Sequence, residues 1–494
     1  MDNHRLLRLP FNLDYKSDTL AYILAFGLFI FMPLAFGYLA VSGQWFIAAA
    51  ILLFLPAFVL IVRNPFLAIF GWLAIGPFII VIPSSMQPVY WLVHRLLPVG
   101  ALTILWINNI IGLQTRKFPK PNIAEWSMLL YVFVSLVSVI TTNNDPFDVI
   151  TVLYDRVLIP MSLYFLIRIW SPQEKDIKQL IPMLLVLVFS QVSIGLLAWF
   201  YPSVLPNYWL DWAGQRTTGS LRSYGAFVSA MLFAGLPILH TALNSESGLW
   251  RKMLFFGFFL SIFGAFFSFS RAGWLALAVV IACLVYLYPK GMLRSILVLI
   301  PVVTLLAAGP LSGQITWASE RLNSPESEAS ALSRLPTFMA SVRMFQAKPI
   351  FGWGYENFNE YDFQFYSRVG DLVNPEKDHS SHNFFMTMLA EQGMIGFILF
   401  MFPAVYWLFQ TKRTISNFPT SGFMSRKLLL ILWLFPLAFA ILNLFQSMKV
   451  IYALGIFWLN LGLIASLVTT HLQPSPAAIS TQSDLVTVIV EAEK

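Results

Sequence analysis

The residues best suited to acid–base chemistry gather where a long polar segment runs into an apolar one, at His379, His382, Asn383 and Glu391. Polar groups at the edge of a hydrocarbon layer cost free energy and usually serve a function. A histidine near its ordinary pKa can take a proton from a hydroxyl. The stretch therefore predicts one half of an active site. Glu391 follows His382 by nine residues, so it is either a second base or, as we favour, a helix-packing residue.

Two upstream polar stretches carry arginines that could form the other half of this site. Residues 215–223 contain Arg216 and Arg222, and residues 268–275 contain Arg271 between two apolar runs. A guanidinium offers a planar fork of donors that matches phosphate oxygens and keeps its charge when it leaves water. Arg216 and Arg271, with Arg222 as a competitor of Arg216, therefore predict a site for an anionic substrate.

Each of these residues also has a purely structural explanation. Arg271 could anchor a helix hairpin at the lipid headgroups, and Arg216 and Arg222 could be ordinary loop charges. His382 could cap the following helix or bond a backbone carbonyl. From the sequence alone, the functional and the structural explanation of each residue stay open.

The elements that must position these residues are transmembrane helices. The sequence is 58% hydrophobic and 11% charged, whereas a soluble domain averages about 25% charged residues. A span needs roughly 20 apolar residues, so we predict an all-α polytopic integral membrane protein with about 12–14 transmembrane helices. The expected spans are 20–40, 45–62, 66–83, 90–112, 124–141, 150–169, 179–200, 223–243, 252–269, 272–288, 294–309, 383–409, 428–446 and 450–470. Asp155 and Arg156 lie inside one of them, where they could pair with other helices or line the site.

The distribution of positive charge predicts the topology. With residues 1–19 in the cytoplasm, most Lys and Arg residues fall on the cytoplasmic side, and the short outer loops 41–44, 84–89 and 142–149 contain none. The tail, residues 471–494, is then cytoplasmic as well. The formal charge of +7 reflects this topology, and nucleic acid is not an expected partner.

Residues 201–222 and 310–382 form the two long outer loops. Loops as long as the second one are usually functional or disordered, and we expect this one to be ordered in part. Ser324-Pro325-Glu326 is typical of a helix start. Apolar residues at helical spacing follow over 326–346, so we expect a helix that covers a cavity or lies on the outer face.

The sequence shows no cluster of Cys, His and Asp with metal-ligand spacing, so we expect catalysis without a metal or another cofactor. Its single cysteine, Cys283, excludes an intramolecular disulfide.

With these motifs in order, the chain resembles the O-antigen ligase and O-antigen polymerase superfamily of bacterial inner-membrane glycosyltransferases. Arg271-Ala-Gly-Trp-Leu275 is similar to the family's Arg-x3-Leu pattern, and the spacing from His382 to Gly393 is similar to its His-x10-Gly pattern. Lys348-Pro349 followed by Gly352-Trp-Gly354 resembles its Pro-hydrophobic-Gly-x-Gly turn. Arg216-Thr-Thr-Gly219 is a looser match. The resemblance covers roughly residues 200–445, which suggests N-terminal helices over 20–200 and a ligase-like domain over 201–470.

The resemblance implies a reaction at the periplasmic face of the bacterial inner membrane. Such enzymes move a glycan from undecaprenyl diphosphate to an acceptor hydroxyl, without metal or nucleotide sugar. The acceptor is lipid A-core for a ligase and a lipid-linked glycan for a polymerase, and membrane lipids surround both. Arg216 and Arg271 would stabilise the diphosphate and His382 would act as the base. Arg222, Arg334, Arg343, Asn383 and Glu391 are expected to contribute to substrate binding.

Two other functions compete with this interpretation. A protein O-oligosaccharyltransferase often carries a sizeable periplasmic domain after its last helices, which this sequence does not show. A polysaccharide-related transporter or flippase would place its charged groups near the bilayer midplane, often in broken helices. The candidate residues cluster at outer helix ends instead, which argues against transport.

Overall fold

A computed structural model describes residues 59–84, 87–112, 118–143, 145–210, 216–246, 248–309, 311–323, 332, 334–366, 381–446 and 449–472. The chain divides into two units, Met1–Pro65 and Phe66–Lys494. Of the first unit only residues 59–65 are described, and residues 59–63 are helical. The predicted span 20–40, most of 45–62, the helix start at Ser324, His379 and almost all of the tail lie outside the described residues.

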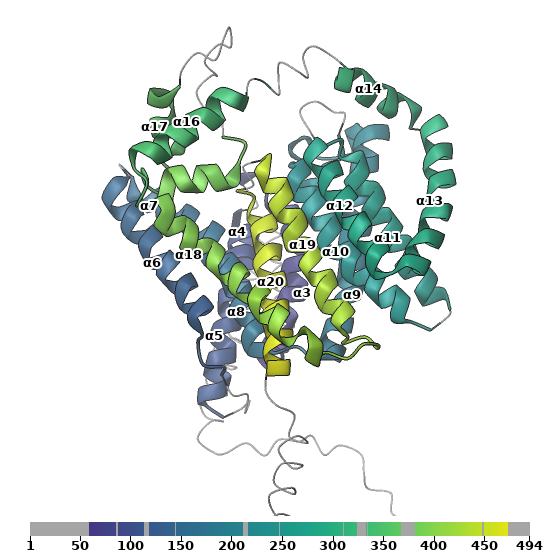
Figure 1. The fold of residues 1–494 in the computed structure, drawn as a ribbon, viewed down its shortest axis with the longest axis horizontal. Coiled ribbons are helices and arrows are strands. Elements are labelled where there is room, and N and C mark those ends of the chain that lie inside the picture. The colour runs from purple at the N-terminus through teal and green to yellow at the C-terminus, as the bar shows by residue number, and fades with distance from the viewer. Residues whose placement is uncertain are drawn as a thin grey trace, which may run out of the picture. The chain divides into compact units, whose positions relative to one another are not determined.

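The described part of the second unit is built from helices and contains no strand (Figure 1). Nine helices or continuous helical runs in this part of the chain are long and apolar enough to span a membrane, and α3 and α12 are shorter apolar helices. The all-α polytopic membrane fold is therefore confirmed. The helices are α3 (Leu67–Ile79), α4 (Gln87–Tyr90), α5 (Leu97–Ile110), α6 (Ile123–Thr142), α7 (Pro146–Leu153), α8 (Ile159–Trp170), α9 (Glu174–Phe200), α10 (Tyr224–Asn244), α11 (Leu249–Phe267), α12 (Arg271–Leu287), α13 (Pro289–Ala308), α14 (Ser312–Asn323), α16 (Arg334–Ala347), α17 (Phe358–Tyr361), α18 (Phe384–Thr414), α19 (Arg426–Leu444) and α20 (Ile451–Leu472).

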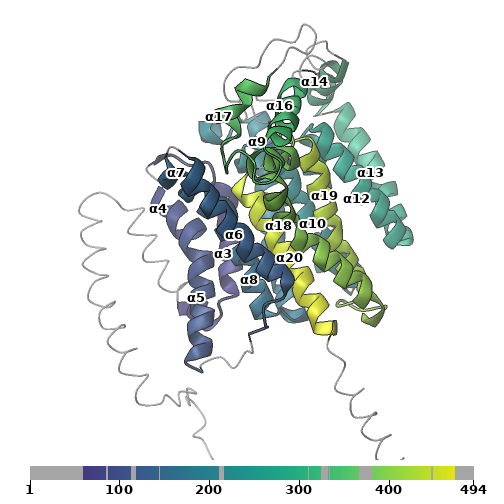
Figure 2. The ribbon, with the colours of Figure 1, turned by 60° about the vertical axis from the view of Figure 1, so that its left-hand side comes forward.

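Helices α10 and α20 are almost entirely buried, as expected for helices that are hydrophobic on every side. Helix α20 packs against α8, α18 and α19, and α10 packs against α9, α11 and α19 (Figures 1 and 2). Polar side chains join these helices inside the unit. Asn460 Nδ2 donates to the Leu432 carbonyl at 3.0 Å, and Trp407 Nε1 donates to the Tyr164 hydroxyl at 2.9 Å. Such bonds help helices associate where lipid provides no hydrophobic driving force.

Asp155 forms a buried ion pair between two neighbouring helical runs. Arg95 Nε and Nη2 each donate to its carboxylate at 2.6 Å, and the Tyr90 hydroxyl donates at 2.8 Å. Both charged residues sit in short π-helical segments, Trp91–Leu96 and Tyr154–Leu158. Asp155 therefore does pair with another helix, which was one of the two alternatives for it.

Helix α18 is broken at Gly393, whose φ of 62° and ψ of −165° are not helical. The first piece, 384–392, runs across the ends of neighbouring helices, whereas the second runs down alongside them (Figure 1). The loop after α16 docks into this break. Met394 N donates to the Pro349 carbonyl at 2.8 Å, Ile395 N donates to the Ile350 carbonyl at 3.2 Å, and Gly354 N donates to the Glu391 carbonyl at 2.7 Å. The loop thus satisfies the backbone groups that the break releases.

Two glycines allow the loop and the broken helix to approach this closely. A Cβ on Gly393 would lie 2.3 Å from the Ile350 carbonyl oxygen, and one on Gly352 would lie 2.4 Å from the Glu391 carbonyl. The spacing from His382 to Gly393 thus has a structural explanation. It spans the N-cap Asn383 and the first α18 piece, and it ends at the break. The glycine in this motif has a structural role.

We predict that Gly393→Ala destabilises the protein by about 1–3 kcal/mol or more, because alanine is strained at this positive φ and collides with the Ile350 carbonyl. Thermal unfolding in detergent measures the change. Gly100→Ala in α5 is the matched control, since a Cβ there meets no atom within 4 Å. Equal melting temperatures for the Gly393→Ala variant and the unaltered protein would contradict the packing described here.

Candidate functional site

The candidate residues lie at helix termini that gather at one end of the second unit. Helix α11 ends at Phe267 and α12 begins at Arg271, so only Ser268, Phe269 and Ser270 separate them. Ser270 caps α12 by accepting a hydrogen bond from Gly273 N at 3.2 Å. Arg271 is exposed at the first position of α12. A cation is unfavourable there because a helix N-terminus already carries partial positive charge. The helix N-terminus and the Arg271 guanidinium together favour a bound anion.

Arg216 is anchored beside the same helix end. The adjoining Thr217 N donates to the Phe267 carbonyl at 3.4 Å. The Arg216 guanidinium lies 4.6 Å from the centroid of the Tyr224 ring. Its Nε atom is buried and has no hydrogen-bond partner in the part of the chain that the structure describes. A buried donor of this kind is costly unless something else pairs with it.

Arg334, at the start of α16, joins Arg216 and Arg271. Partial removal from water lowers the pKa of the Arg334 guanidinium, and the positive charges of Arg271 and Arg216 lower it further against an opposing contribution from Tyr224. Charges affect one another in this way only when they are close. The structure therefore brings together three of the predicted arginines, one from each of three separate segments.

The other two predicted arginines have different surroundings. Arg222 is exposed and takes a left-handed conformation, with φ of 52°, at the end of the 3₁₀ turn Gly219–Leu221. Arg343 Nη1 donates to the Phe365 carbonyl at 2.9 Å and so ties α16 to the short helical turn Asp362–Phe365. This hydrogen bond gives Arg343 a structural role.

His382 directly precedes the N-cap of α18. Asn383 is that cap, since its Oδ1 accepts from Met386 N at 3.0 Å, and its Nδ2 donates to the Leu444 carbonyl at 3.1 Å. His382 is half-buried and takes a left-handed φ of 53°. Gln446 connects this segment to α12, because its carbonyl accepts from Phe384 N and its Nε2 donates to Ser270 Oγ, both at 3.2 Å.

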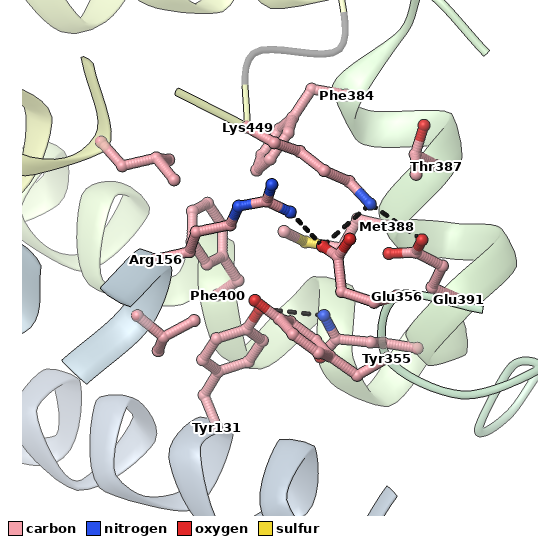
Figure 3. Close-up of a pocket in the computed structure, with 13 residues that line it drawn as sticks. Tyr131, Arg156, Tyr355, Glu356, Phe384, Thr387, Met388, Glu391, Phe400 and Lys449 are labelled. Atoms are coloured by element: carbon pink, nitrogen blue, oxygen red, sulfur yellow. Dashed lines mark hydrogen bonds and ion pairs between the residues drawn. The ribbon is translucent and has the colours of Figure 1, made fainter. Parts of the chain in front are cut away.

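Glu391 belongs to a chain of four alternating charges beneath the first α18 piece (Figure 3). Lys449 Nζ lies 2.9 Å from Glu391 Oε1 and 3.0 Å from Glu356 Oε1, and Arg156 Nη1 lies 2.7 Å from Glu356 Oε1. Glu391 also accepts from Phe358 N at 3.3 Å. These contacts correspond to the helix-packing alternative for Glu391, whereas Arg156 pairs with a residue of the loop after α16 and not with another helix.

Burial raises the pKa of Glu356, but Lys449 and Arg156 outweigh it, so the pKa lies below its ordinary value. Burial conversely lowers the pKa of Lys449, yet Glu391 and Glu356 outweigh it and the pKa is raised. Glu356 and Lys449 are therefore stabilised as ions by their neighbours. Two cations and two anions cancel, whereas neither Arg216 nor Arg334 has an ion-pair partner among the described residues.

Three important residues were not identified as site residues from the sequence. Tyr224 supports Arg216 through its ring, Gln446 joins two helix starts, and Lys449 bridges two carboxylates. The only sequence signal was that Lys449 is a lone charge between two apolar runs. No described group of three or more His, Cys, Asp or Glu side chains is arranged to hold a metal ion.

We predict that Glu356→Gln lowers the melting temperature at neutral pH and that its difference from the unaltered protein shrinks in acid. Because the folded-state pKa of Glu356 is lowered, its contribution is present above the ordinary glutamate pKa of about 4.3 and is lost as the pH falls through the folded-state value. Thermal unfolding at a series of pH values tests this. Glu174→Gln, at a surface pair with Lys178, should show little difference at any pH. A Glu356→Gln difference that stays constant down to acid pH would refute the assignment.

Residues 256–401 match the family model described as O-antigen ligase. This segment begins within α11, contains Arg271, Arg334, the Gly352–Gly354 turn and His382, and ends in the second piece of α18. Arg216 and the α19–α20 connection lie outside it. No curated protein matches the sequence. The match supports the O-antigen ligase superfamily for residues 256–401, and the apolar helices make the chain a multi-pass membrane protein.

Proposed function

We propose that the protein transfers a glycan from undecaprenyl diphosphate to an acceptor hydroxyl. The observation that carries this proposal is the convergence of Arg216, Arg271 and Arg334 at helix ends. Three neighbouring guanidiniums repel one another, and a bound diphosphate would remove that repulsion. A leaving group that develops negative charge is stabilised by cations already fixed in place. These residues could supply that stabilisation from the chain itself.

His382 is the proposed general base. In the reaction, the acceptor oxygen attacks the anomeric carbon and its proton passes to an imidazole nitrogen. The bond from the anomeric carbon to the diphosphate oxygen breaks, and the diphosphate leaves with the electron pair beside the arginines. The geometry that supports this role is the position of His382 at the start of α18, which Gln446 joins to the start of α12. Holding donor and acceptor in one orientation would supply much of the remaining rate.

The proposed location is the bacterial inner membrane, with the site at the periplasmic face and both termini in the cytoplasm. A ligase, with lipid A-core as the acceptor, is the first candidate, and the matched family model fits a ligase and a polymerase alike. A polymerase that extends a lipid-linked glycan is the second candidate, since the connection between α13 and α18 is long. Transport is disfavoured because the arginines lie at helix ends rather than at mid-helix breaks.

We predict that His382→Ala and Arg271→Ala each lower the rate of glycan transfer on the order of 10²-fold or more, because one removes the base and the other a fixed cation. The purified protein is supplied with undecaprenyl diphosphate-linked oligosaccharide and with either lipid A-core or a second lipid-linked oligosaccharide. Product on lipid A-core identifies a ligase, and a lengthened lipid-linked glycan identifies a polymerase. Arg251→Ala, at the opposite end of α11, controls for loss of a membrane-edge arginine. Near-normal product in either site variant, with the protein inserted, would overturn the assignment.

We also predict that a topology reporter fused within residues 330–375 reports a periplasmic location, because the proposed donor presents its glycan on that side. An alkaline phosphatase fusion should be active there, and a fusion in the connection between α18 and α19 should be inactive. The reverse pattern would separate the arginine cluster from its proposed substrate.

A further inference from the structure

The connection between α19 and α20 contributes to both halves of the candidate site. We infer that Gln446 and Lys449, which we term the clamp, are positioning residues that set His382 relative to Arg271. Arg271 is the first residue of α12, and His382 directly precedes the N-cap of α18. Helices α19 and α20 lie between α12 and α18 (Figure 1). The distance between base and cation therefore depends on what bridges the two helix starts.

Gln446 and its neighbour Leu444 hold the starts of both helices. Gln446 Nε2 donates to Ser270 Oγ at 3.2 Å, and Ser270 is the N-cap of α12, immediately before Arg271. The Gln446 carbonyl accepts from Phe384 N, the first residue of α18, at 3.2 Å. The Leu444 carbonyl accepts from the side chain of Asn383, the N-cap of α18. One short connection thus binds the residue before Arg271 and the residues after His382.

Lys449 holds the opposite end of the first α18 piece. Its Nζ contacts Glu391, two residues before the break at Gly393, and Glu356 on the loop that docks into the break. Glu391 is only 3% exposed. Removing Lys449 would take away the cation that pairs with the buried Glu391 carboxylate, whereas Glu356 would keep Arg156, so the cost falls on the first α18 piece. The clamp therefore holds the His382-bearing piece of α18 at both ends.

Backbone strain around the clamp indicates that this geometry is imposed. Phe269, Glu356 and His382 have φ values of 48°, 63° and 53°, a region that side-chain-bearing residues seldom adopt. Such conformations persist only where surrounding contacts over-determine them. Each of these three residues lies within two positions of a partner of the clamp or is itself a partner; the partners are Ser270, Phe384 and Glu356.

The inference rests on the proposed transfer reaction, and it predicts a particular kinetic signature. Gln446 and Lys449 are assigned to hold groups that act on the substrate. A misplaced base lowers the rate of the bound complex, whereas the arginines still bind the donor. Gln446→Ala and Lys449→Met should therefore lower kcat about 10- to 100-fold while the KM for the lipid-linked donor changes less than about twofold. Lys449→Arg retains the charge and should recover most of the lost kcat.

The kinetic test uses the purified full-length protein with undecaprenyl diphosphate-linked oligosaccharide as donor. Arg168→Met is the matched control, because Arg168 forms an even more deeply buried ion pair with Glu125 away from the clamp. It should lower thermal stability without the selective loss of kcat. Unchanged kcat in both clamp variants, a rise in KM that accounts for their defect, or an equal loss of kcat in Arg168→Met would overturn the inference.

Hydrogen–deuterium exchange supplies a readout that does not need activity. Peptides covering 268–275 and 381–392 should exchange faster in Gln446→Ala and Lys449→Met, and not in Arg168→Met. Gln446→Ala keeps the backbone carbonyl that accepts from Phe384, so this variant retains part of the link if Lys449→Met fails to fold. Unchanged exchange at both helix starts overturns the clamp whatever the activity. An inactive unaltered protein with faster exchange in the clamp variants overturns the proposed function and supports the clamp.

Discussion

The break in α18 is the constraint on which the rest of the site depends. Backbone groups released inside a membrane protein must find partners, and here the loop 349–354 supplies them to both sides of Gly393. That docking directs the first piece of α18 across the helix ends and leaves His382 at its start. It also buries Glu391, which in turn requires a cation. Lys449 meets that requirement and ties the break to the start of α20.

The charged residues of the candidate site form two clusters, one neutral overall and one positively charged. The Arg156, Glu356, Lys449 and Glu391 cluster is neutral when all four groups are ionised, so it stabilises the fold and leaves no net charge for a ligand. The Arg216, Arg271 and Arg334 cluster accumulates charge of one sign. A protein tolerates such repulsion where it serves binding, and the same number of cations next to carboxylates would attract an anion much less strongly.

Most of the strained backbone positions lie near these two clusters. Of the five described residues other than glycine with positive φ, Phe269, Glu356 and His382 flank or belong to these clusters, Arg222 ends the turn that follows Arg216, and Ser171 is the C-cap of α8. Residues in such conformations cost of order 1–3 kcal/mol each and collect at functional sites. The hydrogen bonds of Ser270, Asn383 and Gln446 stabilise the neighbouring backbone, so the helix starts are held in place before any substrate binds.

By itself, the sequence determined the helical membrane fold, because apolar runs of the right length have few other stable arrangements. It also identified Arg216, Arg271 and Arg334 as candidates, through residue type and position near helix ends, and His382 through the motif spacing. It did not separate the arginines that converge from Arg343, which bonds the Phe365 carbonyl. Nor did it find Gln446 or the partners of Lys449, since these contacts join residues 58 to 176 positions apart. Only the tertiary structure decided them, because a hydrogen bond or ion pair between distant segments depends on how helices pack and leaves no periodic pattern in the chain.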